Sequence, residues 1–135
     1  DVDIEFGRAD GDHRMSQATA AALAVTAART ADDKKAERTL VLFVGDVLSI
    51  TEYFVITSAS NRRLVRMVVD EIETAVREQH GRSPLRVEGV AEQQWVLIDY
   101  GDAVIHVFSD EIRAYYEIER LYRDVPKIDW QLEKA

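Results

Sequence analysis

The stretch Trp95–Phe108, WVLIDYGDAVIHVF, constrains the fold of this chain more than any other segment. Two apolar runs flank the short turn 100–102, which is the pattern of a β-hairpin. Both runs are apolar at almost every position, so we expect both strands to be covered on both faces, as in the middle of a sheet. Polar groups are costly to bury there, so Trp95, Asp99 and His106 are the places to look for function.

The composition of the chain narrows the classes of partner. Its 135 residues suit one domain with its own core. A net charge of −8 without a basic stripe disfavours direct, sequence-specific nucleic-acid binding and favours a protein partner with a basic surface. No run approaches the roughly 20 apolar residues of a membrane span. The absence of cysteine excludes disulfides and thiolate metal sites and fits a cytoplasmic protein.

The sequences of the two ends of the chain predict segments outside the folded domain. Residues 1–15 are acidic, contain glycine and lack a signal-peptide pattern, so we expect a leader or tag outside the fold. The domain is then expected to span 16–123. The tail 124–135 contains Pro126 and is expected to be loosely held.

Apolar periodicity predicts an α/β fold with the order α-β-β-α-β-β-β-α. The clearest helix is 62–79, with apolar residues at three- and four-residue spacings and Gly81 as its stop. An alanine-rich helix is expected at 16–37, capped by Ser16. The other expected elements are strands at 40–44, 53–57, 85–90, 95–100 and 103–109 and a helix at 110–122. Adjacent strands on either side of the central helix predict a mixed five-stranded sheet with flanking helices.

Carboxylates offer one route to catalysis. Asp99 and Asp102 flank the hairpin turn, and Asp46 and Glu52 fall near other strand ends. Close carboxylates can bind Mg²⁺ or shift each other's pKa. Aspartate is also common in turns, because its side chain bonds its own backbone, and we favour that interpretation here. Glycine-rich nucleotide motifs and a nucleophile elbow are absent, so we predict no catalytic residue, cofactor or metal site.

Three other residues of the hairpin admit two interpretations each. His106 has no second histidine at ligand spacing, so a hydrogen-bonded core residue is favoured over a general base or metal ligand. Trp95 and Tyr100 stand at opposite ends of one strand and on opposite faces if the strand is regular. Each of the two fits a core or a binding interface equally well.

Three segments together resemble the ribosomal silencing factor family, RsfS, also called Iojap-related proteins. They are SITEYFVITSASNRR, the hairpin WVLIDYGDAVIHVF and RAYYEIERLY, and the resemblance runs from about Leu40 to Tyr122. Glu52 and Tyr122 depart from the family, which often has Asp and Trp there, but both keep the chemical class.

The resemblance implies a fold and a function. The fold would be nucleotidyltransferase-like without its catalytic metal-binding acids. The protein would bind ribosomal protein uL14 on the large subunit, block association with the small subunit and repress translation under nutrient limitation. The residues implied against the ribosomal partner are Trp95, Asp99, Tyr100, Gly101 and Asp102. A homodimer is implied off the ribosome.

Two other functions stay open at this point. The clustered acids and the implied fold suggest a metal-dependent nucleotidyltransferase-like enzyme. Direct RNA binding is the other alternative, and the net charge of −8 disfavours it.

Overall fold

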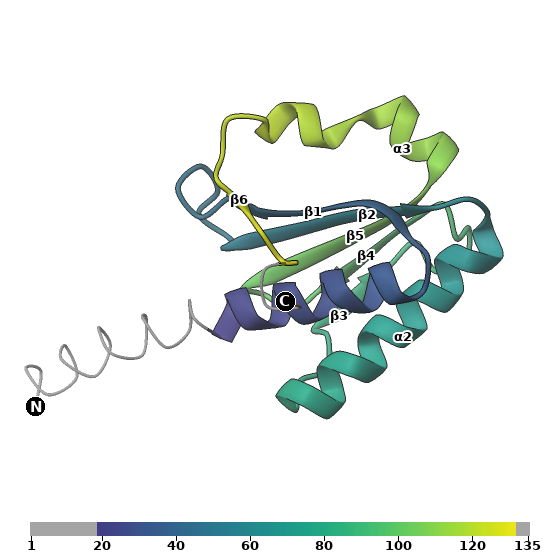
Figure 1. The fold of residues 1–135 in the computed structure, drawn as a ribbon, viewed down its shortest axis with the longest axis horizontal. Helices are drawn as coiled ribbons and strands as arrows, with labels where there is room; N and C mark the ends of the chain where they lie inside the picture. The colour runs from purple at the N-terminus through teal and green to yellow at the C-terminus, as the bar shows by residue number, and fades with distance from the viewer. Residues whose placement is uncertain (1–18, 132–135) are drawn as a thin grey trace, which may run out of the picture.

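A mixed six-stranded sheet organises the fold in the computed structural model, which describes residues 19–131 (Figure 1). The helices are a first helix at residues 19–33, α2 (Arg62–His80), α3 (Asp110–Tyr116) and the 3-10 helix η1 (Ile118–Tyr122). The strands are β1 (Glu37–Phe43), β2 (Tyr53–Ala59), β3 (Arg86–Glu88), β4 (Trp95–Asp99), β5 (Ala103–Ser109) and β6 (Lys127–Ile128). The first helix and α2 lie on one face of the sheet, and α3 lies on the other.

The strand order is β3-β4-β5-β2-β1-β6. β2 and β5 pair in parallel at the centre, and the other neighbouring pairs are antiparallel. The predicted mixed sheet and the predicted hairpin of β4 and β5 are therefore confirmed. The predicted number of strands is wrong, because the C-terminal segment adds β6.

The C-terminal segment is part of the fold. β6 pairs with β1, with Ile128 opposite Val41. Beyond it, Trp130 is buried and its indole N–H donates to the carbonyl oxygen of Thr39 at 3.0 Å. The segment that we expected to be loosely held thus closes one edge of the sheet, because Ile128 and Trp130 bring apolar surface to the end of the chain.

The expected helix 110–122 is divided in two. α3 ends at Tyr116, where Glu117 takes a left-handed conformation (φ +45°) and its N–H bonds the carbonyl oxygen of Arg113. This backbone bond is a C-terminal helix cap, and the chain continues as η1. The first helix is described from residue 19 to 33 of the expected 16–37. Its expected cap Ser16 and the expected leader 1–15 lie outside the described residues.

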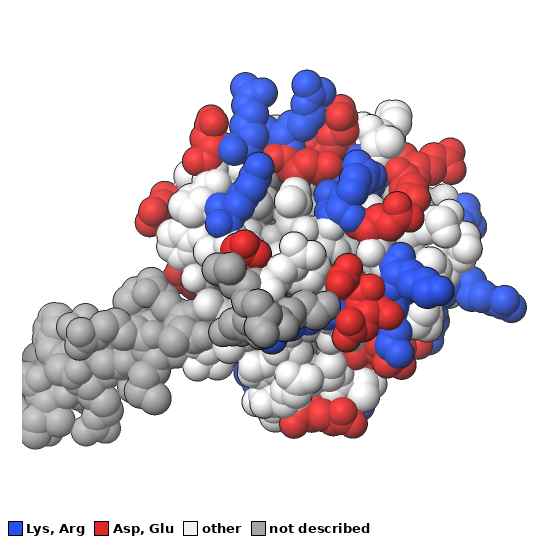
Figure 2. All heavy atoms as spheres, viewed as in Figure 1, with Lys and Arg blue, Asp and Glu red and all other residues white. Residues whose placement is uncertain are grey.

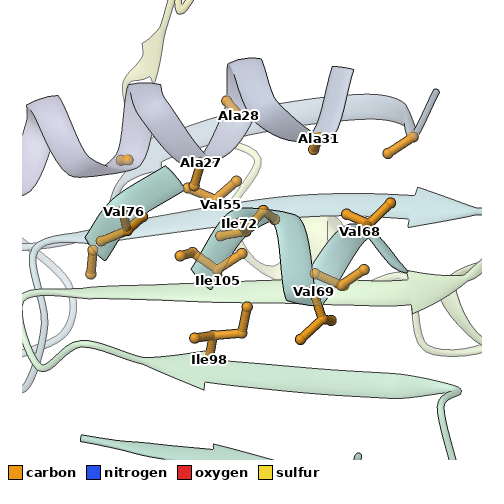
Figure 3. Close-up of a cluster of buried hydrophobic side chains, with 14 of the residues drawn as sticks. Ala27, Ala28, Ala31, Val55, Val68, Val69, Ile72, Val76, Ile98 and Ile105 are labelled. Atoms are coloured by element: carbon orange, nitrogen blue, oxygen red, sulfur yellow. The ribbon is translucent and has the colours of Figure 1, made fainter. Parts of the chain in front are cut away.

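One face of the sheet is closed by two helices with complementary surfaces (Figure 3). α2 is capped before its first residue by Asn61, whose side chain accepts a bond from the N–H of Leu64, and after its last residue by the left-handed Gly81. Its buried stripe is Val65, Val68, Val69, Ile72 and Val76. The small alanines of the first helix, among them Ala27 and Ala31, are fully buried in the same cluster. The predicted amphipathic helix is confirmed, and alanine lets the first helix pack closely.

The other face is only partly covered. α3 packs on β5 and β2, over a cluster that includes the buried Phe54 and Phe108. In β4, Val96 and Ile98 are fully buried on the helix-covered face, whereas Trp95, Leu97 and Asp99 are only half-buried. The expectation that both hairpin strands are covered on both faces therefore fits β5 and is wrong for β4.

A buried arginine fastens α3 to the sheet. The Arg113 side chain is 2% exposed, and its Nη1 donates to Ser58 Oγ at 3.0 Å and to the carbonyl oxygen of Glu37 at 3.2 Å. Its Nε pairs with Glu119 at 3.2 Å. Burial lowers the pKa of Arg113, and the Glu119 carboxylate opposes that shift. Arg113 is thus a structural anchor for the segment that borders the open part of the sheet.

Candidate functional site

The structure separates the five residues that the sequence groups into one site. Trp95 pairs with Phe108 at one end of β4, and Asp99 pairs with Val104 at the other end. The strand rise places about 13 Å between Trp95 and Asp99. The turn residues follow beyond Asp99, so Trp95 and the turn occupy opposite ends of the hairpin.

The acidic residues at the turn are engaged in turn chemistry. Asp99 Oδ1 accepts a bond from the N–H of Gly101 at 2.8 Å, and its Oδ2 pairs with Arg86 at 3.1 Å. Gly101 has φ +90°, a conformation that glycine adopts without strain. Asp102 forms a two-pronged pair with Arg82, at 2.9 Å for both contacts. These contacts are the intrachain turn contacts that we expected of the two aspartates.

The other predicted acids do not complete a metal site. The backbone N–H of Glu52 donates to the carbonyl oxygen of Asp102 at 3.0 Å, so Glu52 does lie beside the turn, while Asp46 is exposed in its loop. Among residues 19–131 no group of three or more His, Cys, Asp or Glu side chains could hold a metal ion.

Tyr100 lies in the core. Its side chain is 2% exposed and belongs to the cluster under the first helix and α2. Burial raises the pKa of Tyr100 to about 12, with the Glu73 carboxylate adding to the shift. The sequence placed Tyr100 and Trp95 on opposite faces, as observed, but the implied role of Tyr100 as a surface contact does not fit its burial.

Trp95 lies on the open face of the sheet. Its ring packs against Phe108, with centroids 4.8 Å apart, and against Tyr116, at 5.1 Å. Tyr116 is 52% exposed and Leu97 is half-buried beside it. Two shallow hollows meet at the tryptophan. One is lined by Glu88, Gly89, Trp95 and Leu97, and the other by Gly89, Glu92, Gln94, Trp95, Ile112 and Tyr116.

The loop 89–94 holds Trp95 in this place. Gly89 has φ +85°, and a Cβ atom there would lie 2.0 Å from the carbonyl oxygen of Trp95. Any larger residue would therefore push the loop off the strand. At the other end of the loop, the N–H of Ser109 donates to the carbonyl oxygen of Gln94 at 2.8 Å.

Sequence reasoning missed Leu97 and Tyr116 as members of this surface and Gly89 as a residue that lines its hollows. Leu97 shares the strand parity of Trp95, which is a usable signal. Tyr116 packs against the Trp95 ring while staying half exposed. We call Trp95, Leu97, Asp99 and Tyr116 the Trp95 surface.

Charged groups of both signs border the Trp95 surface, where Arg86 pairs with Glu88 at 3.3 Å and with Asp99 at 3.1 Å. Among the described residues that line its two hollows, Glu88 and Glu92 are charged and none is lysine or arginine. Over the face seen in Figure 2, acidic and basic side chains are interspersed with uncharged surface, without an unbroken basic stripe on its described part. An apolar centre with a polar rim and no basic residue in its hollows is typical of a protein-binding surface rather than of a nucleic-acid groove.

Comparison with known proteins identifies the family. A family described as "Ribosomal silencing factor during starvation" matches residues 17–135. The ribosomal silencing factor RsfS of Halalkalibacterium halodurans is 37% identical over 103 residues, which cover 76% of this chain and 87% of that protein. The chloroplastic protein Iojap of Arabidopsis thaliana is 30% identical over 112 residues, covering 83% of this chain and 46% of the plant protein.

The chain belongs to the RsfS family. A crystal structure from Bacillus halodurans agrees in fold, with a TM-score of 0.66 and 35% identity over 77% of this chain and 93% of that chain. The resemblance drawn from the three sequence segments is thus confirmed, and with it the assignment as a ribosomal silencing factor.

RsfS membership also bears on the enzyme alternative. The family is one of non-enzymatic ribosome-silencing factors, so the nucleotidyltransferase-like enzyme is not supported. Membership implies binding to the large ribosomal subunit. Within residues 19–131 no helix is long and apolar enough to cross a membrane.

Proposed function

We propose that this RsfS protein represses translation under nutrient limitation by binding ribosomal protein uL14 through the Trp95 surface. The body of the domain then excludes the small subunit from the large one by volume. The observation that carries the proposal is the contact between the partly buried Trp95 and the half-exposed Tyr116 on the uncovered face of β4. Tryptophan and tyrosine dominate the binding energy of many protein interfaces.

Charge supports a protein partner embedded in RNA. The rim residue Glu92 suits basic groups on a ribosomal protein, because complementary potentials steer encounter, whereas Glu88 pairs with Arg86 within the chain. The net charge of −8 disfavours landing on bare rRNA phosphates. The partner surface and the repulsion around it together restrict where the protein can dock.

The turn contributes to this site indirectly in our proposal. Asp99 ends the Trp95 surface and presents a half-buried carboxylate beside Arg86. Gly101 and Asp102 fix the shape of the chain at that end. Tyr100 supports the strand from the core and makes no contact with the partner.

Co-sedimentation with purified large subunits tests the proposal. Trp95→Ala is expected to weaken binding by roughly 30- to 1,000-fold, the effect of losing an interface hot spot of about 2–4 kcal/mol. The matched control is Ile50→Ala, because Ile50 is 82% exposed in the loop before β2, beyond the opposite end of the sheet. When small subunits are added, the wild type and the Ile50→Ala control should reduce the amount of joined ribosomes, and Trp95→Ala should not. Equal binding by Trp95→Ala and the wild type would refute the site.

We further propose that the free protein acts in the cytoplasm as a homodimer that covers the same apolar surface. Exposed apolar patches favour self-association. Sedimentation equilibrium should find a dimer for the wild type and a monomer for Trp95→Ala. A wild-type monomer at all concentrations, or a dimer unaffected by the substitution, would contradict this part of the proposal.

A further inference from the structure

His106 is a polar residue in an apolar place beside the Trp95 surface. It lies on β5 opposite Leu97, on the same face of the sheet as Trp95, and is 5% exposed. Phe54 meets its ring edge to face at 4.6 Å, and Phe108 stacks with it at 6.2 Å. Neither phenylalanine can form a hydrogen bond with the imidazole nitrogens. The burial of a polar histidine at this position must therefore be explained by another contact.

A hydrogen bond with Trp95 explains the buried histidine. The indole Nε1 of Trp95 lies 3.2 Å from His106 Nδ1. An indole nitrogen can only donate, so Nδ1 must be the unprotonated, accepting nitrogen of the ring. Burial lowers the pKa of His106 to about 4, so the ring stays neutral near pH 7 and Nδ1 remains free to accept.

The other contacts of the indole do not involve its N–H. Phe108 and Tyr116 pack against the ring, with centroids 4.8 and 5.1 Å from that of Trp95. An indole turned over about its Cβ–Cγ bond would lose the hydrogen bond to Nδ1. The bond to His106 therefore favours the observed orientation, in which the opposite edge of Trp95 is left to face the two hollows.

We propose that His106 is a positioning residue for docking: it holds the Trp95 indole in the single orientation that the ribosomal partner recognises. The inference rests on the proposed function of the Trp95 surface. A ring that is ordered before binding loses less conformational freedom on binding, and affinity rises accordingly.

Substitutions of His106 separate the hydrogen bond from packing. His106→Leu removes the acceptor and keeps an apolar filling. His106→Asn keeps an acceptor, because its Oδ1 can stand where Nδ1 stood. His106→Gln is a polar control whose oxygen lies one bond further out. Circular dichroism and thermal melting establish that each variant is folded, and the asparagine and glutamine pair carries the comparison if the leucine variant does not fold.

The first readout needs no ribosome. In ¹H–¹⁵N spectra the indole N–H of Trp95 should shift upfield and exchange faster with solvent in His106→Leu, and return towards its wild-type position in His106→Asn. Trp130 is the internal control, since its indole bonds Thr39 and lies elsewhere in the structure. An unchanged Trp95 signal in His106→Leu would overturn the inference.

The second readout is affinity for purified large subunits. His106→Leu should bind about tenfold more weakly than the wild type, and His106→Asn should recover most of that loss. In a Trp95→Phe background, which lacks the donor, the two variants should bind equally. A tenfold effect of His106→Leu that persists in that background would show a merely structural role and overturn the inference. Wild-type protein that fails to bind large subunits would instead refute the proposed function, and the docking role with it, whatever the indole signals show.

Discussion

The two faces of the sheet are built by different means. On the covered face, fully buried aliphatic residues of α2 and alanines of the first helix pack against the strands (Figure 3). On the open face, α3 and η1 cover β2 and β5, and aromatic rings with a hydrogen-bonded histidine occupy the border. The polar anchors Arg113 and His106 both belong to the open side.

The five residues of strand β4 alternate between the covered face and the open face of the sheet. Val96 and Ile98 are fully buried against the helices, while Trp95, Leu97 and Asp99 face the open side. Neighbouring positions of one strand therefore lie in different environments, and our proposal assigns stability to one set and binding to the other. This difference makes substitutions at adjacent residues a sensitive test of the functional assignment.

The substitution with the largest expected effect on stability removes Arg113, which holds α3 against the sheet beside the open face. Arg113→Ala should lower the free energy of unfolding by about 3–5 kcal/mol, because it leaves Glu119 and Ser58 without their buried partner. Urea unfolding followed by circular dichroism measures the change. The control is Arg120→Ala, whose pair with Glu117 is exposed and should contribute at most about 0.5 kcal/mol. Similar losses for the two variants would mean that Arg113 does not anchor α3.

A pair of neighbours on β4 tests the comparison of the two faces. Ile98→Ala should cost about 2–5 kcal/mol of stability through a cavity in the covered core, with unchanged affinity for large subunits under conditions where it is folded. Leu97→Ala should weaken that affinity by about tenfold. Urea unfolding and co-sedimentation measure the two quantities. If Ile98→Ala lost affinity for large subunits and Leu97→Ala did not, the assignment of binding to the open face and of stability to the covered face would be contradicted.

The pH dependence of stability tests the buried histidine. The folded-state pKa of His106 is about 4 and lies below the ordinary value of 6.5, so the unfolded chain binds a proton first as the pH falls. Stability from the neutral ring is fully present above pH 6.5 and is lost as the pH drops towards 4, by up to about 3 kcal/mol. The rings around it, Phe54, Phe108 and Trp95, do not titrate in this range. His106→Asn should lose that component of the pH dependence, and equal profiles for both proteins would contradict it.

Much of the fold was predictable from local pattern. The apolar stripe of α2 and its stop at Gly81 are sequence-local, so the predicted helix 62–79 matches Arg62–His80 almost to the residue. The hairpin was likewise evident from its turn. The break at Glu117 was not, because the helix ends where Arg113 and Glu119 meet across the turn, a contact made only in the folded chain. β6 was missed because two residues become a strand only beside β1.

The site was predictable only in part. Trp95 and its strand parity were recognised, but an apolar run cannot reveal which of its faces lacks a covering helix. The turn residues drew attention because carboxylates are chemically conspicuous, yet Asp99 and Asp102 bond within the chain. His106 was interpreted as a hydrogen-bonded core residue, which the contact with Trp95 confirms. The partner of that bond depended on the diagonal placement of the two residues across β4 and β5.

The most direct measurement is ¹⁹F NMR of this protein labelled with 5-fluorotryptophan and titrated with unlabelled uL14. The chain has two tryptophans, and Trp130 is buried against β1, so its resonance serves as the reference. If the open face of β4 docks on uL14, the Trp95 resonance shifts and loses its sensitivity to solvent as the complex forms, while the Trp130 resonance stays in place. A complex that forms with the Trp95 resonance unmoved and still sensitive to solvent would contradict the Trp95 surface as the docking site.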